Sequence, residues 1–515
     1  MPVEQPVMRM ALDAEVLTCL CYPRPMAQQH LDPLSAQDAR LLSREDACVH
    51  MLIGSVATFE GPAPEIGALR EHVRNRLSVV PRYRQRPAFP PAGLGTARWV
   101  DDPTFNLDYH IRHAALPAPG DIGKLHRMVA RLFSQSLDRT KPLWELYVVE
   151  GLRAERGDRD RWALISKTHL ALVDGTDGID LLTVMFDLDA ESGAPRRTPQ
   201  HDSWQPRPLP TTAQLAAAAL EDRAREAAEL PKQTLEVISD PSRLAGGLLQ
   251  AAGSLLSSVT PKPTAPLDQP IGPHRRYVTI PARLSEFRAI KDALDATVND
   301  VVLATVAGGL RHWLHQRGSR TAGVELYAAV PVSIRVGSEH EGFASRLHQV
   351  VAPLPVDLGD AAARVRLIRD AMRGVKRSAG ALDADLIAGM ADFAPPTILA
   401  QASRLGAPPD SYSLAITNIP GPQTARYVLG RRLESIAPVG FLDEGRPLTV
   451  AVNSYAGSVH FGLLADYDAL PDITEIAVGI EASLEELLQQ VGAVETKDSP
   501  RSHRVQAAGD GAVRA

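Results

Sequence analysis

A histidine followed five residues later by an Asp-Gly pair is the part of this sequence whose residue types could do chemistry. The stretch runs from Trp162 to Gly178 and reads WALISKTHLALVDGTDG. Its apolar first half predicts a strand that ends at His169, and Asp174-Gly175 predicts a tight turn before a helix. An imidazole has an ordinary pKa of about 6.5, so it can take up a proton near neutral pH. We therefore predict a site at this strand end, with His169 and Asp174 as candidates and Gly175 as a position that needs glycine's backbone freedom.

Two stretches of α/β pattern must position this site. In the first, residues 33–194, a strand-like run at 51–59 precedes a helical pattern at 65–79. In the second, residues 273–492, a strand-like run at 277–280 is followed by helical and strand-like patterns up to a last helix near 473–491. A chain of 515 residues suits two domains of roughly 200 residues each. The sequence thus predicts two α/β domains.

A proline-rich segment separates the two patterns. Residues 195–273 are 79 positions and hold 12 of the 41 prolines, a shift in composition that marks a linker. Within it, residues 211–230 lack proline and glycine and are rich in Ala, Glu and Arg, which predicts a helix. We expect a partly helical crossover at 195–272. We also expect an N-terminal extension at 1–32 and a disordered tail at 493–515.

Six further blocks, in order along residues 33–490, carry a resemblance to a known family. They are Pro33–Ala39 with Gly54–Gly61, Asp138–Glu145, Thr297–Asp300, Val330–Ser333, Thr417–Pro422 and Asn453–Gly457. Together with the His/Asp stretch they resemble the bacterial wax ester synthase/diacylglycerol acyltransferases. That family belongs to the superfamily of chloramphenicol acetyltransferase and of the condensation domains of nonribosomal peptide synthetases.

The resemblance implies a fold and a reaction. The fold would be two chloramphenicol acetyltransferase-like domains, with the site in a channel between them. The reaction would be O-acyl transfer from acyl-CoA, as substrate, to diacylglycerol or a long-chain alcohol. It also implies a structural role for Asp174, a role in activity for Asn299 and Asp300, and a place beside the acyl channel for Asn418, Pro420 and Gly421. From the residues alone, Asn299 and Asp300 are expected to begin a helix, and Asn418, Pro420 and Gly421 to form a rigid turn.

One position departs from the family signature His-His-x-x-x-Asp-Gly. The second histidine, taken in the family to be the general base, is Leu170 here. Leucine cannot accept a proton, and in an extended segment His169 points to the opposite face from residue 170. Loss of a general base typically costs a factor of about 10² to 10⁴ in rate. The sequence therefore leaves two functions open: a slow acyltransferase, or a non-catalytic acyl-CoA or lipid-binding protein of the same fold.

Charge and composition limit the partners. The net charge of -6 gives no general attraction to nucleic acid. Three cysteines and no evident signal sequence predict a cytoplasmic protein, either free or bound peripherally to the inner membrane face or to lipid inclusions. The basic run at 364–377 is typical of a solvated helix face and could also meet anionic head groups or CoA phosphates. We expect no metal and no cofactor, since the chemistry needs neither and no ligand cluster is visible.

Overall fold

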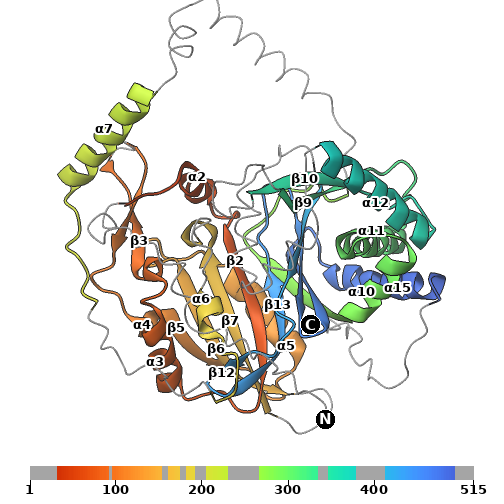
Figure 1. Ribbon diagram of the computed structural model, residues 1–515, viewed down its shortest axis with the longest axis horizontal. Coiled ribbons are helices and arrows are strands. Elements are labelled where there is room, and N and C mark those ends of the chain that lie inside the picture. The colour runs from red at the N-terminus through yellow and green to blue at the C-terminus, as the bar shows by residue number, and fades with distance from the viewer. Residues whose placement is uncertain are drawn as a thin grey trace, which may run out of the picture.

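The computed structural model describes residues 32–91, 95–153, 160–173, 181–191, 204–229, 266–334, 346–378 and 412–492. Two six-stranded sheets with helices packed on them dominate these residues, which confirms the predicted α/β class (Figure 1). The first sheet has the order β12 (Tyr427–Val428), β13 (Arg431–Val439), β2 (Leu52–Glu60), β7 (Asp160–His169), β6 (Trp144–Arg153) and β5 (Ile111–Ala115). The second has the order β10 (Arg346–Leu354), β9 (Leu326–Ile334), β11 (Leu414–Pro420), β14 (Leu448–Tyr455), β15 (Ser458–Asp466) and β8 (Arg275–Arg283).

The strand β13 joins the two halves of the chain. It comes from the second half but pairs antiparallel with β2 in the first sheet, with Val439 opposite Gly54 (Figure 1). It also lies against β14 and β15 of the second sheet. Residues 427–439 thus belong structurally to the first sheet, although the sequence boundaries placed them in the domain at 273–492. The sheets are therefore linked by strand pairing as well as by the chain connection.

The core of the first half lies on both faces of its sheet. The helices of this half are α2 (Ala36–Arg44), α3 (Ile66–Arg76), α4 (Leu107–His110), α5 (Ile122–Phe133) and α6 (Leu181–Met185). Trp162 of β7 is fully buried and its ring stacks on Phe59 of β2 at 4.3 Å. The run of large apolar residues in β7 forms a strand because both of its faces are covered by such side chains.

The second half places its helices against its own sheet. They are α10 (Leu284–Ala293), α11 (Val298–Gln316), α12 (Ala361–Ser378) and α15 (Ile473–Gln490). The helices α11 and α15 approach closely at Gly309, where an added Cβ would lie 2.5 Å from a side-chain carbon of Ile480. Among the described residues, no single helix is long and apolar enough to span a membrane. One bent pair, α10 with α11, passes that length and composition test at an angle of 100°.

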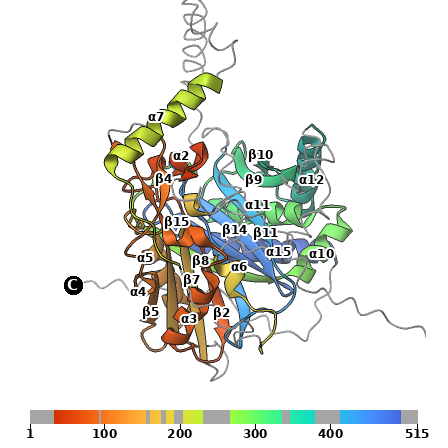
Figure 2. The ribbon, with the colours of Figure 1, turned by 60° about the vertical axis from the view of Figure 1, so that its left-hand side comes forward.

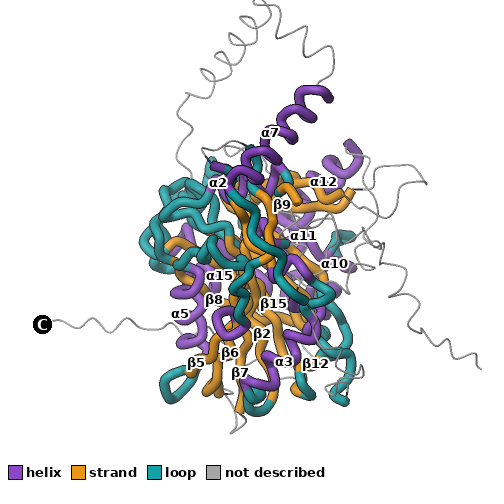
Figure 3. The backbone as a smooth tube through the Cα atoms, turned by 90° about the vertical axis from the view of Figure 1, so that its left-hand side faces the viewer, coloured by secondary structure: helices purple, strands orange, loops and turns teal. Residues whose placement is uncertain are grey.

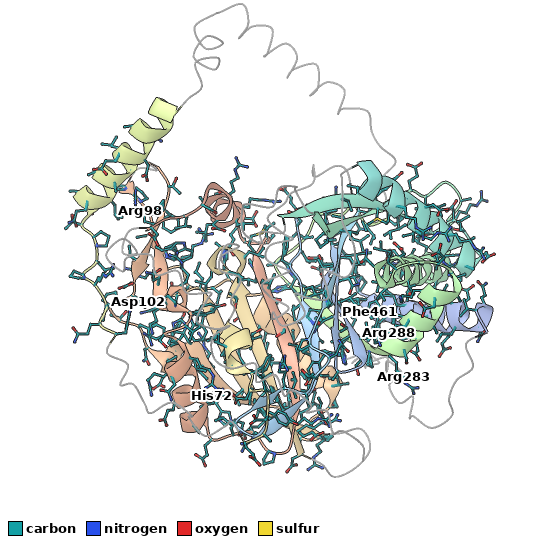
Figure 4. All side chains as sticks on the ribbon, in the orientation of Figure 1. His72, Arg98, Asp102, Arg283, Arg288 and Phe461 are labelled. Carbon is teal, nitrogen blue, oxygen red and sulfur yellow. The ribbon has the colours of Figure 1, made fainter. Side chains whose placement is uncertain are left out.

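The crossover segment contains the predicted helix. It is α7 (Thr212–Glu229), which projects from one corner of the body (Figures 1 and 2). Near the middle of this helix, Arg98 forms an ion pair with Asp222 and donates a hydrogen bond to the carbonyl of Ala218 at 3.1 Å (Figure 4 labels Arg98). Arg98 belongs to a small sheet of β1 (Asp32–Pro33), β4 (Arg98–Asp101) and β3 (Gln85–Ala88). The helix of the crossover is thus fixed to the first half.

The basic run on α12 is only partly a solvated face. Arg364 is buried and pairs with Glu486 of α15 at 2.8 Å, so its interpretation as a solvated cation is wrong. Arg369 donates to the carbonyl of Leu294, and Arg373 pairs with Asp295 at 3.0 Å. The reason is that α12 packs against α11 and α15, and its long side chains reach groups at the ends of the neighbouring elements.

We expect Gly54→Ala to destabilise the protein. Gly54 lies in β2 opposite Lys167, and a Cβ there would lie 1.9 Å from the carbonyl oxygen of Ser166 and 2.8 Å from the ring of Phe133 in α5. The free energy of unfolding should fall by about 3 kcal/mol. Gly67→Ala in α3 is the matched control, because its Cβ meets nothing within 4 Å, and it should leave stability unchanged or raise it by about 0.5 to 1 kcal/mol. Chemical unfolding of both variants tests this, and equal effects would contradict it.

Candidate active site

The strand β7 delivers His169 to the point where the first sheet ends. His169 lies opposite Leu52 of β2, and its backbone N–H donates to the carbonyl of Leu143 at 3.0 Å. The chain then turns into a short 3-10 helix, Leu170–Leu172, and the N–H of Leu170 donates to the carbonyl of Met51 at 2.9 Å. The strand expected from the sequence therefore ends at His169 as predicted, and the turn expected at Asp174-Gly175 lies outside the described residues.

Both ring nitrogens of His169 face groups inside the protein. Nδ1 accepts a hydrogen bond from the backbone N–H of Ala171 at 3.0 Å. Nε2 lies 3.2 Å from Oε1 of Glu45, which is within ion-pair distance, but the geometry is not that of a hydrogen bond. The side chain is 1% exposed. Because Nδ1 accepts a hydrogen bond and Nε2 faces a carboxylate, we assign the ring proton to Nε2. In this arrangement neither nitrogen can take up a proton from a substrate.

Glu45 is the centre of a buried polar cluster beneath the strand end. Its Oε2 accepts two hydrogen bonds from Arg139, at 2.8 and 3.2 Å, and its Oε1 accepts one from the N–H of Met51 at 3.2 Å. Burial by itself raises the pKa of Glu45, but His169 and Arg139 outweigh burial and lower the pKa to about 2. The carboxylate is therefore ionised throughout the neutral range and fixes the orientation of the imidazole.

The other residues of the signature are apolar or lie outside the described part of the chain. Leu170 is fully buried, and Leu172 and Val173 are buried beside it in the core of the first half. Asp174 and Gly175 lie outside the described residues. The face on which the family has its second histidine is thus apolar here, up to the last described residue of the turn.

A second buried polar group lies on the same face of the sheet as His169. Lys167 precedes His169 by two residues and therefore points to the same face, and its Nζ lies 3.7 Å from Glu145. Glu145 also accepts hydrogen bonds from Tyr147 and Arg112, each at 2.7 Å. Burial, opposed in part by Glu145, lowers the pKa of Lys167 to about 8. These charges are paired, so we interpret them as structural.

Of the candidate pair in α11, Asp300 has a capping role. The hydroxyl of Thr297 accepts from the N–H of Asp300 at 3.2 Å, and the carboxylate of Asp300 accepts from the N–H of Thr297 at 2.8 Å. Asp300 is buried and Asn299 is half-buried. In the described part of the structure, no hydrogen bond or ion pair joins either residue to His169.

The candidate turn after β11 lies beside the end of β14. Asn418 and Pro420 are half-buried in a strand parallel to β14. Gly421 donates its N–H to the hydroxyl of Ser454 at 3.2 Å, and a Cβ on Gly421 would lie 2.2 Å from the carbonyl oxygen of Ser454. Glycine is required here by this close approach of two backbones. As with α11, no hydrogen bond or ion pair within the described ranges connects this turn to His169.

Sequence reasoning missed Glu45 and Arg139. Arg139 lies inside the block Asp138–Glu145, and Glu45 follows the first helix of the chain, but neither was singled out. Their separation of 94 residues leaves no local pattern that would pair them. Among the described residues, no group of three or more His, Cys, Asp or Glu side chains could hold a metal ion.

Comparison with known proteins places the chain in a family. The sequence model of the wax ester synthase/diacylglycerol acyltransferase catalytic domain matches residues 34–302, and that of the WS/DGAT C-terminal domain matches residues 345–488. The chain belongs to the wax ester synthase/diacylglycerol acyltransferase family. The resemblance seen in the sequence blocks is thereby confirmed.

Relatives of this family align with nearly the whole chain. A probable diacylglycerol O-acyltransferase of Mycobacterium tuberculosis, tgs1, is 32% identical over 89% of this chain and 96% of its own length. A second, tgs2, is 30% identical over 90% of this chain and 100% of its own length. The solved wax ester synthase/diacylglycerol acyltransferase of Marinobacter aquaeolei VT8 is 26% identical, with a TM-score of 0.62, and covers 89% of this chain and 100% of that one.

A condensation domain shares the fold alone. The first condensation domain of the calcium-dependent antibiotic synthetase is 14% identical, with a TM-score of 0.51, over 90% of this chain and 99% of its own. This likeness agrees with the predicted superfamily, in which two α/β domains of this kind lie side by side.

We expect Glu45 to make stability depend on acid pH. A carboxyl whose pKa falls from 4.5 to about 2 on folding contributes stability above pH 4.5 and loses it as the pH falls toward 2. The full contribution is on the order of 3 kcal/mol. Glu45→Gln should therefore lower stability at pH 7 and flatten its decline between pH 5 and pH 3, as measured by urea unfolding. Glu150→Gln, whose side chain is 46% exposed, is the control, and an identical decline in both variants would contradict the assignment.

Proposed function

We propose that this protein transfers an acyl group from acyl-CoA to the hydroxyl of a lipid alcohol, either diacylglycerol or a long-chain alcohol. In this reaction the hydroxyl oxygen bonds to the thioester carbonyl, the C–S bond breaks, the hydroxyl loses its proton and the departing thiolate gains one. The products are a triacylglycerol or wax ester and free CoA. The family match across both halves of the chain is the observation that carries this proposal.

The proton is the difficult part of this reaction in this protein. The hydroxyl must lose its proton as it attacks, and Leu170 stands where the family has its base. His169 has Nδ1 engaged by Ala171 and Nε2 directed at Glu45. We infer that His169 is a positioning residue: it holds the end of β7 and the turn that leads to Asp174. Binding and orientation of the two substrates then supply the catalysis, at a rate about 10² to 10⁴ lower than with a base.

A second function is supported by the same observations. With Leu170 fully buried and His169 enclosed, the strand end could serve a protein that binds acyl-CoA or lipid without turnover. An esterification assay distinguishes the two functions: purified protein, labelled palmitoyl-CoA and dioleoylglycerol, with saturable palmitoyl-CoA binding measured in parallel. Slow, protein-dependent formation of triacylglycerol supports the acyltransferase. Binding without any ester, with hexadecanol also tried as acceptor, supports the binding protein.

We further propose that the protein reaches its lipid alcohol by binding peripherally to a lipid surface. On α12, Arg364 and Arg369 are bonded within the protein, whereas Arg366 is exposed and Arg373 remains exposed beside its partner Asp295. Each cation close to an anionic surface contributes about 1 kcal/mol, so we expect weak, salt-sensitive binding. Co-sedimentation with phosphatidylglycerol vesicles that persists unchanged at high salt would contradict it.

Leu170→His is expected to accelerate ester formation. It restores a proton acceptor four residues before Asp174, and turnover should rise by a factor of about 10² to 10⁴. Because the site is fully buried and apolar, the polar ring should also lower the free energy of unfolding by about 1 to 3 kcal/mol. Leu170→Asn is the matched control, since it buries a polar group of similar cost that is not a base.

Two outcomes would overturn this account of Leu170. One is a folded, palmitoyl-CoA-binding Leu170→His protein that is no faster than Leu170→Asn. The other is a fast native enzyme whose activity His169→Ala abolishes without unfolding it, because His169 would then be the base.

A further inference from the structure

A large cleft separates the two halves on one side of the molecule. Its volume is about 2040 Å³. One wall is α5 of the first half, and the other consists of β8, β15 and α15 of the second half; Figure 3 shows α5, β8 and α15 next to one another. Figure 4 marks two of its lining residues, Phe461 and Arg283, in the second half. His169 does not line it.

The α5 wall of the cleft carries cations that nothing in the described structure neutralises. Arg127 and Arg131 are four residues apart and so lie on one face of α5, and Arg153 lies near the start of that helix at the end of β6. All three are exposed, and none has an ion-pair partner among the described residues. The lining as a whole contains seven arginines and five carboxylates, whereas the whole chain has a net charge of -6. The cleft is thus a positive region in an acidic protein.

The carboxylates of the cleft do not cancel these cations. Glu434 is engaged by Arg161 at 2.8 Å, and Asp121 caps α5 by accepting from the N–H of Lys124 at 2.7 Å. Glu481 and Glu485 lie on α15, on the opposite wall, where burial and the neighbouring Glu485 raise the pKa of Glu481 to about 7. Glu286 belongs to the second half as well. An anion in the cleft is therefore favoured on the α5 side.

The inner end of the cleft approaches the strand end that carries the motif. At the end of α5, the hydroxyl of Ser134 accepts from the N–H of Arg275 at 2.9 Å, and the guanidinium of Arg275 donates to the carbonyl of Cys48. Three residues further along, the carbonyl of Met51 accepts from the N–H of Leu170. The separation from Cys48 to Met51 is at most about 11 Å, and α5 itself is about 18 Å long. The lining residues Ser134 and Arg275 are thus connected to the end of β7 through hydrogen bonds to Cys48 and Met51.

We propose that this cleft binds the nucleotide end of coenzyme A, with Arg127 and Arg131 contacting its phosphates. The pantetheine arm then runs along α5 toward Ser134 and the end of β7. Arginine suits this task because its planar fork donates two parallel hydrogen bonds to phosphate oxygens. The inference rests on the proposed function for the choice of a thioester of coenzyme A, and on the geometry and charge of the cleft for the site.

The test compares ligands with and without phosphates on four full-length proteins. These are the native chain, R127A/R131A, R127K/R131K and the control R223A, which removes an exposed arginine on α7, a helix that does not line the cleft. Calorimetry with coenzyme A measures binding. Kinetics with octanoyl-CoA and with the octanoyl thioester of N-acetylcysteamine, which lacks the nucleotide, measure KM and kcat. Thermal unfolding checks that all four proteins are folded, as expected for exposed positions.

We expect R127A/R131A to bind coenzyme A at least 10-fold more weakly, R127K/R131K to bind with intermediate affinity because lysine keeps the charge but not the paired hydrogen bonds, and R223A to be unchanged. The KM for octanoyl-CoA should rise with kcat unaffected, and the KM for the N-acetylcysteamine thioester should stay the same. Equal coenzyme A affinity in native protein and R127A/R131A, or no coenzyme A binding by native protein, overturns the inference. Arginine-dependent binding without any ester formation upholds the cleft site and refutes the proposed acyl transfer. Ester formation with an unchanged KM for octanoyl-CoA upholds the acyl transfer and refutes the cleft site.

Discussion

The pairing of β13 with β2 is the interaction on which the rest of this structure depends. A strand from residues 431–439 completes the sheet of the first half and at the same time lies against β14 and β15 of the second. Backbone hydrogen bonds between strands have little freedom to slide, because a shift of one residue would turn every side chain to the other face. The two sheets are therefore held in one relation to each other. The cleft between α5 and α15 and the end of β7 are consequences of that relation.

The buried Glu45 explains why the histidine of the motif is so firmly held. A carboxylate removed from water is costly unless it is paired and hydrogen-bonded, and Glu45 is satisfied by Arg139, by the N–H of Met51 and by the nearby ring of His169. The same contacts that satisfy the carboxylate use the imidazole nitrogen that could otherwise approach a substrate. In this chain the first histidine of the signature thus contacts Glu45 and the backbone of Ala171, and the second position is Leu170.

The charges of the cleft show how a protein with an acidic net charge can still present a site for an anion. Cations gather on α5, on the first half, while Glu481 and Glu485 lie on α15, on the second half. Charges separated by a solvent-filled cleft interact weakly, so each wall keeps its own sign of charge. The net charge of the whole chain contains no information about such a local arrangement, which depends on which helix faces which.

The sequence by itself determined the local elements and the family. The apolar run ending at His169, the proline-free helix of the crossover and the capping residues before α11 each depend on neighbours in sequence, so pattern and propensity suffice for them. The six ordered blocks identified the family. Tertiary structure alone decided what depends on residues far apart: the insertion of β13 into the first sheet, the burial of Arg364 against Glu486, and the pairing of His169 with Glu45. The partners in these contacts are separated by about one hundred to several hundred residues in the sequence. No local pattern encodes them, because the packing of sheets and helices determines which residues meet.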